Sequence, residues 1–140
     1  AYCLMPTHFH FTLRQEQEDG IKKFIERISN SYAHYFNISR DGRGGVFERN
    51  FKAIHVNNDY QLIHLSRYIH LNSVTSYLVE NPEDYPYSSY RAYIGLENNP
   101  MIDPSEVLSQ FSSIEQYKKF VMNQKNYQRE LKKIKDILLE

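Results

Sequence analysis

The first thirteen residues decide the fold of this chain, because they predict two extended segments joined at a turn: Ala1-Tyr2-Cys3-Leu4-Met5-Pro6-Thr7-His8-Phe9-His10-Phe11-Thr12-Leu13. Residues 1–4 and 8–13 have the apolar and aromatic content of strands, and Met5-Pro6-Thr7 interrupts them. Because strand side chains alternate between faces, we expect His8 and His10 to project side by side while Phe9 turns into the core. Two imidazoles on one face can hold a metal ion between them, and a third ligand must come from elsewhere.

Helices are expected to follow this hairpin. Apolar residues at helical spacing predict an amphipathic helix over about residues 20–36, and a polar loop with glycines follows over 37–45. Residues 47–56 alternate as a strand does. A second helix is expected from a cap at Asn58 or Asp59 to about Leu71. The predicted fold class is therefore α+β, an antiparallel sheet with helices packed on it.

The remaining residues predict shorter pieces and then a helical tail. Residues 74–79 and 88–94 are expected to form brief helices on either side of a turn at 82–86, and Asp103-Pro104-Ser105-Glu106 has the cap and proline of a helix start. Ser113 is expected to open the last helix. An apolar stripe along that helix permits packing on the core or a homodimer. The stripe consists of Tyr127, Leu131, Ile134 and Leu138.

Composition narrows the class of protein. A length of 140 residues fits one domain with a core of its own. Cys3 is the only cysteine, which excludes an internal disulfide and a thiolate zinc cluster and favours a reducing compartment. We find no signal peptide, lipidation motif or membrane-spanning apolar run, so a soluble cytoplasmic protein is expected.

The net charge is zero, but the basic residues gather in two places. One group surrounds the glycines of the first loop: Arg40, Arg43, Arg49 and Lys52. The other lies in the tail: Lys118, Lys119, Lys125, Arg129, Lys132, Lys133 and Lys135. Segregated charge lets an anionic partner bind one face of a neutral protein, whereas the plainer interpretation of the tail group is a solvated helix surface.

The second predicted helix offers two ways to complete a site with the histidines. Tyr60, His64, Tyr68 and Asn72 lie four apart and form one ridge, beside an apolar stripe of Leu62, Leu65 and Ile69 that would seat the helix on the sheet. The ridge supplies a phenol as a nucleophile and an imidazole or amide oxygen as a ligand. From the residues alone, the pairing of Tyr60 with His64 and that of Tyr68 with Asn72 both stay open, and packing roles for both tyrosines also fit.

Four blocks in order along the chain resemble the REP-associated tyrosine transposases, a branch of the single-tyrosine HUH transposases of bacterial insertion sequences. The blocks are Tyr2-Cys3-Leu4-Met5-Pro6-Thr7-His8-Phe9-His10-Phe11, Gly45-Val46-Phe47-Glu48-Arg49-Asn50-Phe51-Lys52, Arg67-Tyr68-Ile69-His70-Leu71-Asn72 and Pro82-Glu83-Asp84-Tyr85-Pro86-Tyr87-Ser88-Ser89-Tyr90. The resemblance covers about residues 2–95. It implies an HUH transposase-like catalytic domain over residues 1–95 and a helical C-terminal extension over 96–140.

The resemblance also implies an activity, namely metal-dependent nicking and joining of single-stranded DNA next to a hairpin. His8 and His10 would bind the divalent metal, Asn72 would complete its ligands, and Tyr68 would be the nucleophile that forms a 5′-phosphotyrosine intermediate. Two imidazoles and an amide favour Mn²⁺ over Mg²⁺, although either is expected to serve. The family acts in the bacterial cytoplasm at the nucleoid.

Phosphate contacts are expected from the basic groups. The first candidates for binding the DNA backbone are Arg40, Arg43, Arg49 and Lys52. The lysines of the tail would form a second phosphate-binding surface. Nothing in the sequence indicates which hairpin is recognised.

The chain departs from the family at several positions. The family usually has Asn where Thr7 stands, so a looser metal site is expected, and Pro where Ser73 stands. A strand and a helix normally precede the Tyr2-Cys3 strand, so we expect an unprotected sheet edge beside the histidine strand. Two alternatives follow: a catalytically impaired descendant that only binds hairpin DNA, and an unrelated two-histidine metal enzyme, such as a hydrolase, in which Tyr68 merely packs.

Overall fold

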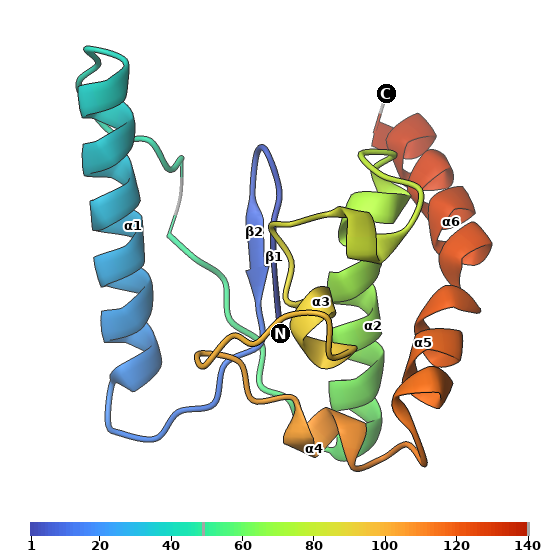
Figure 1. The fold of residues 1–140 in the computed structure, drawn as a ribbon. Coiled ribbons are helices and arrows are strands. Elements are labelled where there is room, and N and C mark those ends of the chain that lie inside the picture. Colours follow the sequence, from blue (N-terminus) through green and yellow to red (C-terminus); the bar gives the residue numbers. More distant parts are fainter. Residues whose placement is uncertain (49, 140) are drawn as a thin grey trace. The chain divides into compact units, whose positions relative to one another are not determined.

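The computed structural model describes residues 1–48 and 50–139, and the chain divides into two compact units. The first unit combines residues 1–12 with 56–140, and the second spans residues 13–55. The class is α+β, as expected, with a two-stranded antiparallel sheet and several helices (Figure 1). Within the described residues, no helix is long and apolar enough to cross a membrane.

The two strands of the first unit form a hairpin. Strand β1 (Tyr2–Leu4) pairs with β2 (Phe9–Phe11), and the Met5 amide donates to the His8 carbonyl at 2.8 Å to close the turn. On its other edge β1 meets residues 87–89, where the Leu4 amide donates to the Tyr87 carbonyl at 2.8 Å. Strand β1 is therefore bonded on both sides, whereas the unprotected edge expected beside the histidine strand stays a prediction.

Helix α2 (Asp59–Thr75) contacts β1 on one side and the C-terminal helices on the other (Figure 1). Asn58 caps it as predicted, since its side-chain oxygen accepts the Gln61 amide at 2.9 Å. The helix runs past the expected end at Leu71, and residues 74–75 belong to it rather than to a separate short helix. Every residue from Ile69 to Thr75 is buried. This last part of the helix therefore has no solvent-exposed polar face, and the amphipathic pattern that would locate the end of the helix in the sequence is missing.

The register of the hairpin decides which of its faces α2 covers. Opposed residues on antiparallel strands share a face, so His10 lies on the same face as its partner Cys3. Cys3 is fully buried and packs with Ile69 of α2. Phe9 lies on the other face, half-buried, with its ring 5.1 Å from that of Phe11. The prediction that Phe9 turns into this core is wrong. The alternation of side chains along the strand shows that Phe9 and the two histidines lie on opposite faces, but it does not show which face the helix covers.

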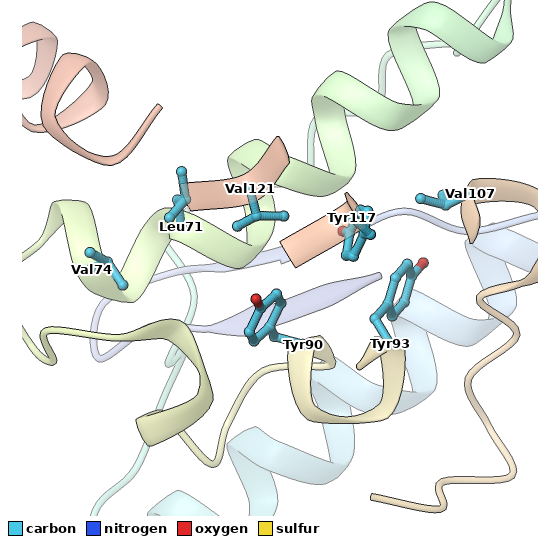
Figure 2. Packing of buried hydrophobic residues seen from close by; sticks show 7 residues of the cluster. All are labelled: Leu71, Val74, Tyr90, Tyr93, Val107, Tyr117 and Val121. Carbon is cyan, nitrogen blue, oxygen red and sulfur yellow. The ribbon is translucent and has the colours of Figure 1, made fainter. Parts of the chain in front are cut away.

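The main core of the first unit joins α2 to the short helices α3 (Tyr90–Tyr93) and α4 (Ser105–Leu108) and to α5 (Ile114–Met122). Its buried side chains are Leu71, Val74, Tyr90, Tyr93, Val107, Tyr117 and Val121 (Figure 2). They come from both sides of residue 95. The division into a catalytic domain over residues 1–95 and a helical extension over 96–140 stays a prediction.

Ser113 caps α5 as expected, whereas the residue that caps α4 is Pro104 rather than the expected Asp103. The Asp103 carboxylate accepts the Ser105 amide at 3.0 Å, and the Ser113 hydroxyl accepts the Gln116 amide at 3.2 Å. The turn at 82–86 contains a short 3₁₀ helix, η1 (Pro82–Asp84). The single last helix that we expected is divided, because α5 ends at Met122 and α6 (Lys125–Leu139) begins after a break.

The second unit consists of helix α1 (Gly20–Ser39) and the chain on either side of it. The Asn37 side-chain amide donates to the Gly44 carbonyl at 3.0 Å, and Gly44 has the left-handed φ of 98° that favours glycine. Among the described residues of 47–56 there is no strand, so that prediction is wrong. Ile54 is 93% exposed, and a strand pattern becomes a strand only where a neighbouring strand pairs with it.

Candidate metal and nucleophile site

His8 and His10 lie side by side, as the strand alternation predicted. Their ring centroids are 5.0 Å apart and the rings are nearly perpendicular, at 83°. His8 is exposed at the end of the turn, whereas His10 is half-buried within β2. Burial lowers the pKa of His10, and the charge of His8 lowers it further. A neutral imidazole keeps a lone pair available for a cation.

Thr7 supports the first of these rings. Its hydroxyl oxygen lies 3.1 Å from Nδ1 of His8. When Nδ1–H of His8 donates to that oxygen, Nε2 carries the lone pair that can bind a cation. Thr7, which is not itself a candidate ligand, then holds the ring of His8 in its orientation. The sequence shows at Thr7 only the loss of the usual Asn, because a contact between adjacent side chains leaves no mark on residue spacing.

Tyr68 is the tyrosine that meets this pair. Its ring lies edge-on to His10, with centroids 5.6 Å apart, and the side chain is 45% exposed. Tyr60 instead packs on His64 at 4.2 Å, and Nδ1 of His64 accepts a hydrogen bond from Arg67 at 2.6 Å. The structure thus brings Tyr68, and not Tyr60, to the His8/His10 pair.

Asn72 lies one helical turn after Tyr68 on α2. Its side chain is 7% exposed, and its Nδ2 finds no hydrogen-bond partner among the described residues. A buried amide group without a hydrogen-bond partner lowers the stability of the fold. A half-turn about the last side-chain bond exchanges the positions of the amide oxygen and nitrogen. Within the described part of the chain, no three His, Cys, Asp or Glu side chains gather as a metal site. Asn72 as the third ligand stays a prediction. By their chemistry, two imidazoles and an amide oxygen fit a divalent cation.

The first group of basic residues belongs to the other compact unit. Arg40, Arg43 and Lys52 are exposed there, and the Arg40 guanidinium lies 4.7 Å from the centroid of the Phe36 ring. Arg49 lies outside the described residues. Their role as phosphate contacts stays a prediction.

Part of the C-terminal basic group is bound within the first unit. Lys125 Nζ donates to the backbone carbonyl of Glu80 at 2.6 Å, and Arg129 donates to both carboxylate oxygens of Glu80, at 3.3 and 3.2 Å. Arg129 also donates to the Val74 carbonyl at the end of α2, at 3.0 Å. Lys132 donates to the hydroxyl of Ser76 at 2.6 Å. These three cations hold α6 to the end of α2 and to the residues that follow it, which was not apparent from the sequence.

The apolar stripe of the tail is described in part. Tyr127 is 60% exposed and Leu131 is 40% exposed. The side chains of Ile134 and Leu138 lie outside the described part of the chain. A homodimer through this stripe stays a prediction.

Comparison with known proteins finds one relative to report. The chain is similar to a protein of Haemophilus influenzae named "Putative REP-associated tyrosine transposase", to which it is 26% identical over 110 residues. The similarity covers 71% of this chain and 62% of that protein's length. No family model matches the chain, and no solved structure matches it.

Proposed function

We propose that this chain is a transposase-type enzyme with an HUH-like fold that cuts and rejoins single-stranded DNA next to a hairpin in the bacterial cytoplasm. The observation that carries the proposal is the edge-on contact of Tyr68 with His10, beside His8. The name of the similar protein supports it, since a transposase acts on DNA. The chain spans 62% of that protein's length, so the activity of the whole protein is part of the proposal.

His8, His10 and Asn72 are the residues that would hold the cation, Mn²⁺ in preference to Mg²⁺. When bound, such a cation withdraws charge from the scissile phosphate and orients it. The low pKa of His10 keeps its ring neutral and able to bind, and Thr7 orients His8. The burial of Asn72 limits the amide to few orientations before any ion arrives.

Tyr68 carries the covalent chemistry. Its hydroxyl gives up a proton to solvent, and the phenolate oxygen forms a bond to phosphorus. The bond from phosphorus to the 3′ oxygen breaks, and the leaving strand takes up a proton as a 3′ hydroxyl. A second 3′ hydroxyl reverses these steps on the 5′-phosphotyrosine and joins the strands without ATP. The Tyr68 side chain is 45% exposed, and a phosphate needs such access to approach the phenolic oxygen in line.

A labelled single-stranded hairpin oligonucleotide tests the proposal. Incubated with the protein and Mn²⁺, it is expected to give a covalent protein–DNA band on a denaturing gel. Tyr68→Phe should abolish the band, and Tyr60→Phe, on the same helix, should keep it. Loss of the band in Tyr60→Phe alone would reverse the assignment. Binding of the oligonucleotide without a band would indicate the impaired hairpin-binding descendant, and no binding would exclude both.

A further inference from the structure

His70 is a fully buried histidine that the proposed chemistry does not use. It lies on α2 between Tyr68 and Asn72, and both of its ring nitrogens are bonded. Nδ1 lies 2.7 Å from the hydroxyl of Tyr117 on α5, and Nε2 lies 2.9 Å from the hydroxyl of Ser89. Both groups bonded to the ring are neutral hydroxyls, and the side chain is fully buried, so the ring is held as a neutral imidazole.

A neutral imidazole donates from one nitrogen and accepts at the other, and the surroundings show which. The Ser66 hydroxyl donates to the Ile63 carbonyl at 2.8 Å, and the Tyr117 hydroxyl donates to Ser66 at 3.1 Å. Tyr117 therefore has only its lone pairs to offer His70, so Nδ1–H of His70 donates to it. Nε2 is then the acceptor. The Ser89 hydroxyl proton has two acceptors within reach, Nε2 of His70 at 2.9 Å and the Tyr2 carbonyl at 3.2 Å, and with Nδ1–H committed to Tyr117 it donates to the nearer Nε2.

Ser89 continues the chain of hydrogen bonds to the hairpin. Its hydroxyl oxygen accepts the backbone amide of Tyr2 in β1 at 2.8 Å, and the Ser89 amide donates to the Tyr2 carbonyl at 3.0 Å. Two bonds thus separate the ring on α2 from the backbone of β1. Strand β1 carries Cys3 opposite His10 in its partner strand. The Ser89 side of His70 therefore leads to the proposed metal site, and the Tyr117 side leads away to α5.

Apolar contacts alone define the position of a helix on a sheet loosely, because Ile69 and Leu65 have no preferred direction of contact. A slip of one residue along α2 would move each side chain by 1.5 Å and turn it by about 100°. Such a shift would separate Tyr68 from His10. Directional hydrogen bonds between buried groups exclude it, since a displaced His70 would leave a buried nitrogen without a partner.

We propose that His70 is a positioning residue, which through Ser89 locks the register of α2 on β1 and so keeps Tyr68 against His10. The inference rests on the proposed function, because Tyr68 and His10 are the groups being positioned. The bond to Tyr117 serves to hold α5. The two ring nitrogens of His70 thereby have different roles: Nε2 fixes α2 on β1, and Nδ1 holds α5. If His70 only contributed to the stability of the core, loss of either hydrogen bond would have the same effect.

Ser89→Ala and Tyr117→Phe form a matched pair of variants, since each deletes one hydroxyl bonded to His70. Three measurements are made on each: the rate of covalent adduct formation with saturating hairpin oligonucleotide and Mn²⁺, the dissociation constant for that oligonucleotide, and the thermal midpoint. A fourth measurement needs no activity, namely the NMR cross-relaxation between the ring protons of Tyr68 and His10.

Ser89→Ala is expected to lose about tenfold or more of the adduct rate, because small misplacements of reacting groups are costly, while the DNA affinity stays within about twofold. The ring-to-ring cross-relaxation should weaken as well. Tyr117→Phe should lower the thermal midpoint at least as far and yet keep the rate and the cross-relaxation. Equal losses of rate in both variants, or an unchanged Ser89→Ala, would overturn the proposal.

If the unchanged protein forms no adduct, the proposed function fails, and the cross-relaxation still decides whether His70 positions Tyr68. If Ser89→Ala does not fold, His70→Gln and His70→Asn replace the pair. Gln places its amide near the position of Nε2 and can accept from Ser89, whereas Asn reaches only the position of Nδ1. His70→Gln should keep the contact of Tyr68 with His10, and the opposite order would contradict the proposal.

Discussion

The ring of Tyr68 stands edge-on to the ring of His10, with 5.6 Å between their centroids and 79° between their planes. One residue comes from α2 and the other from β2, so the contact exists only because the helix packs on the hairpin. It joins a candidate nucleophile to a candidate ligand.

Thr7→Val should weaken Mn²⁺ binding by about tenfold, because it removes the oxygen that orients the ring of His8, a loss typical of a partner that supports a metal ligand. Titration calorimetry with Mn²⁺ measures the affinity. Thr7→Ser keeps the hydroxyl and serves as the control. Equal affinities for the valine and serine variants would show that the contact does not matter.

Asn72→Asp should tighten Mn²⁺ binding and improve Mg²⁺ binding more, since magnesium prefers charged oxygen ligands. Without metal the same variant should unfold at a lower temperature, because a buried carboxylate lacks a partner. Added Mn²⁺ should then raise its thermal midpoint by more than it raises that of the unchanged protein. Asn98→Asp adds the same charge at an exposed position, and a similar response there would refute a ligand role for Asn72.

Cys3 should resist alkylation in the folded protein. Burial raises its pKa to about 11, although contacts with Ser73 and Ser88 act in the opposite direction. In the unfolded chain a cysteine has a pKa of about 8.5, so the shift stabilises the fold fully below that pH and is lost as the pH rises toward 11. Ellman's reagent at pH 8 should react only after urea is added, and urea midpoints should fall from pH 8.5 to 11. Fast labelling of the native protein would show that Cys3 is not buried.

Glu80→Gln should loosen α6 and raise the affinity for DNA, because Lys125 and Arg129 lose their carboxylate partner. The hydrogen bonds from Arg129 and Lys125 lower the pKa of Glu80, so its contribution to stability is present above the unfolded pKa and disappears as the pH falls through the folded one. The fall in thermal midpoint should be largest at low salt, since Glu80 is exposed to screening. Glu130→Gln, on the exposed face of α6, is the control, and equal effects of both variants would argue for general charge only.

Residues with a strong local signal behaved as the sequence indicated. The proline turn and the caps at Asn58 and Ser113 depend on contacts within a few residues, so they could be predicted. The class of the fold could be predicted from the periodicity of the apolar residues. The strand at 47–56 and the end of α2 could not, because one depends on a pairing partner and the other on burial by distant helices. The candidate ligands could be named, but the burial of the Asn72 amide could not.

Alternation along a strand is a local property of the chain, and it was enough to place His8 and His10 side by side and Phe9 opposite them. The four-residue ridge was likewise enough to offer Tyr60 and Tyr68 as equivalent candidates. Tertiary packing then separated them. The register of Cys3 against His10 and the burial of Ile69 put α2 on the imidazole face with Tyr68 at the ring of His10. Residue spacing describes each element alone, whereas the meeting of two elements depends on side-chain volumes and on buried hydrogen bonds such as that of His70 to Ser89.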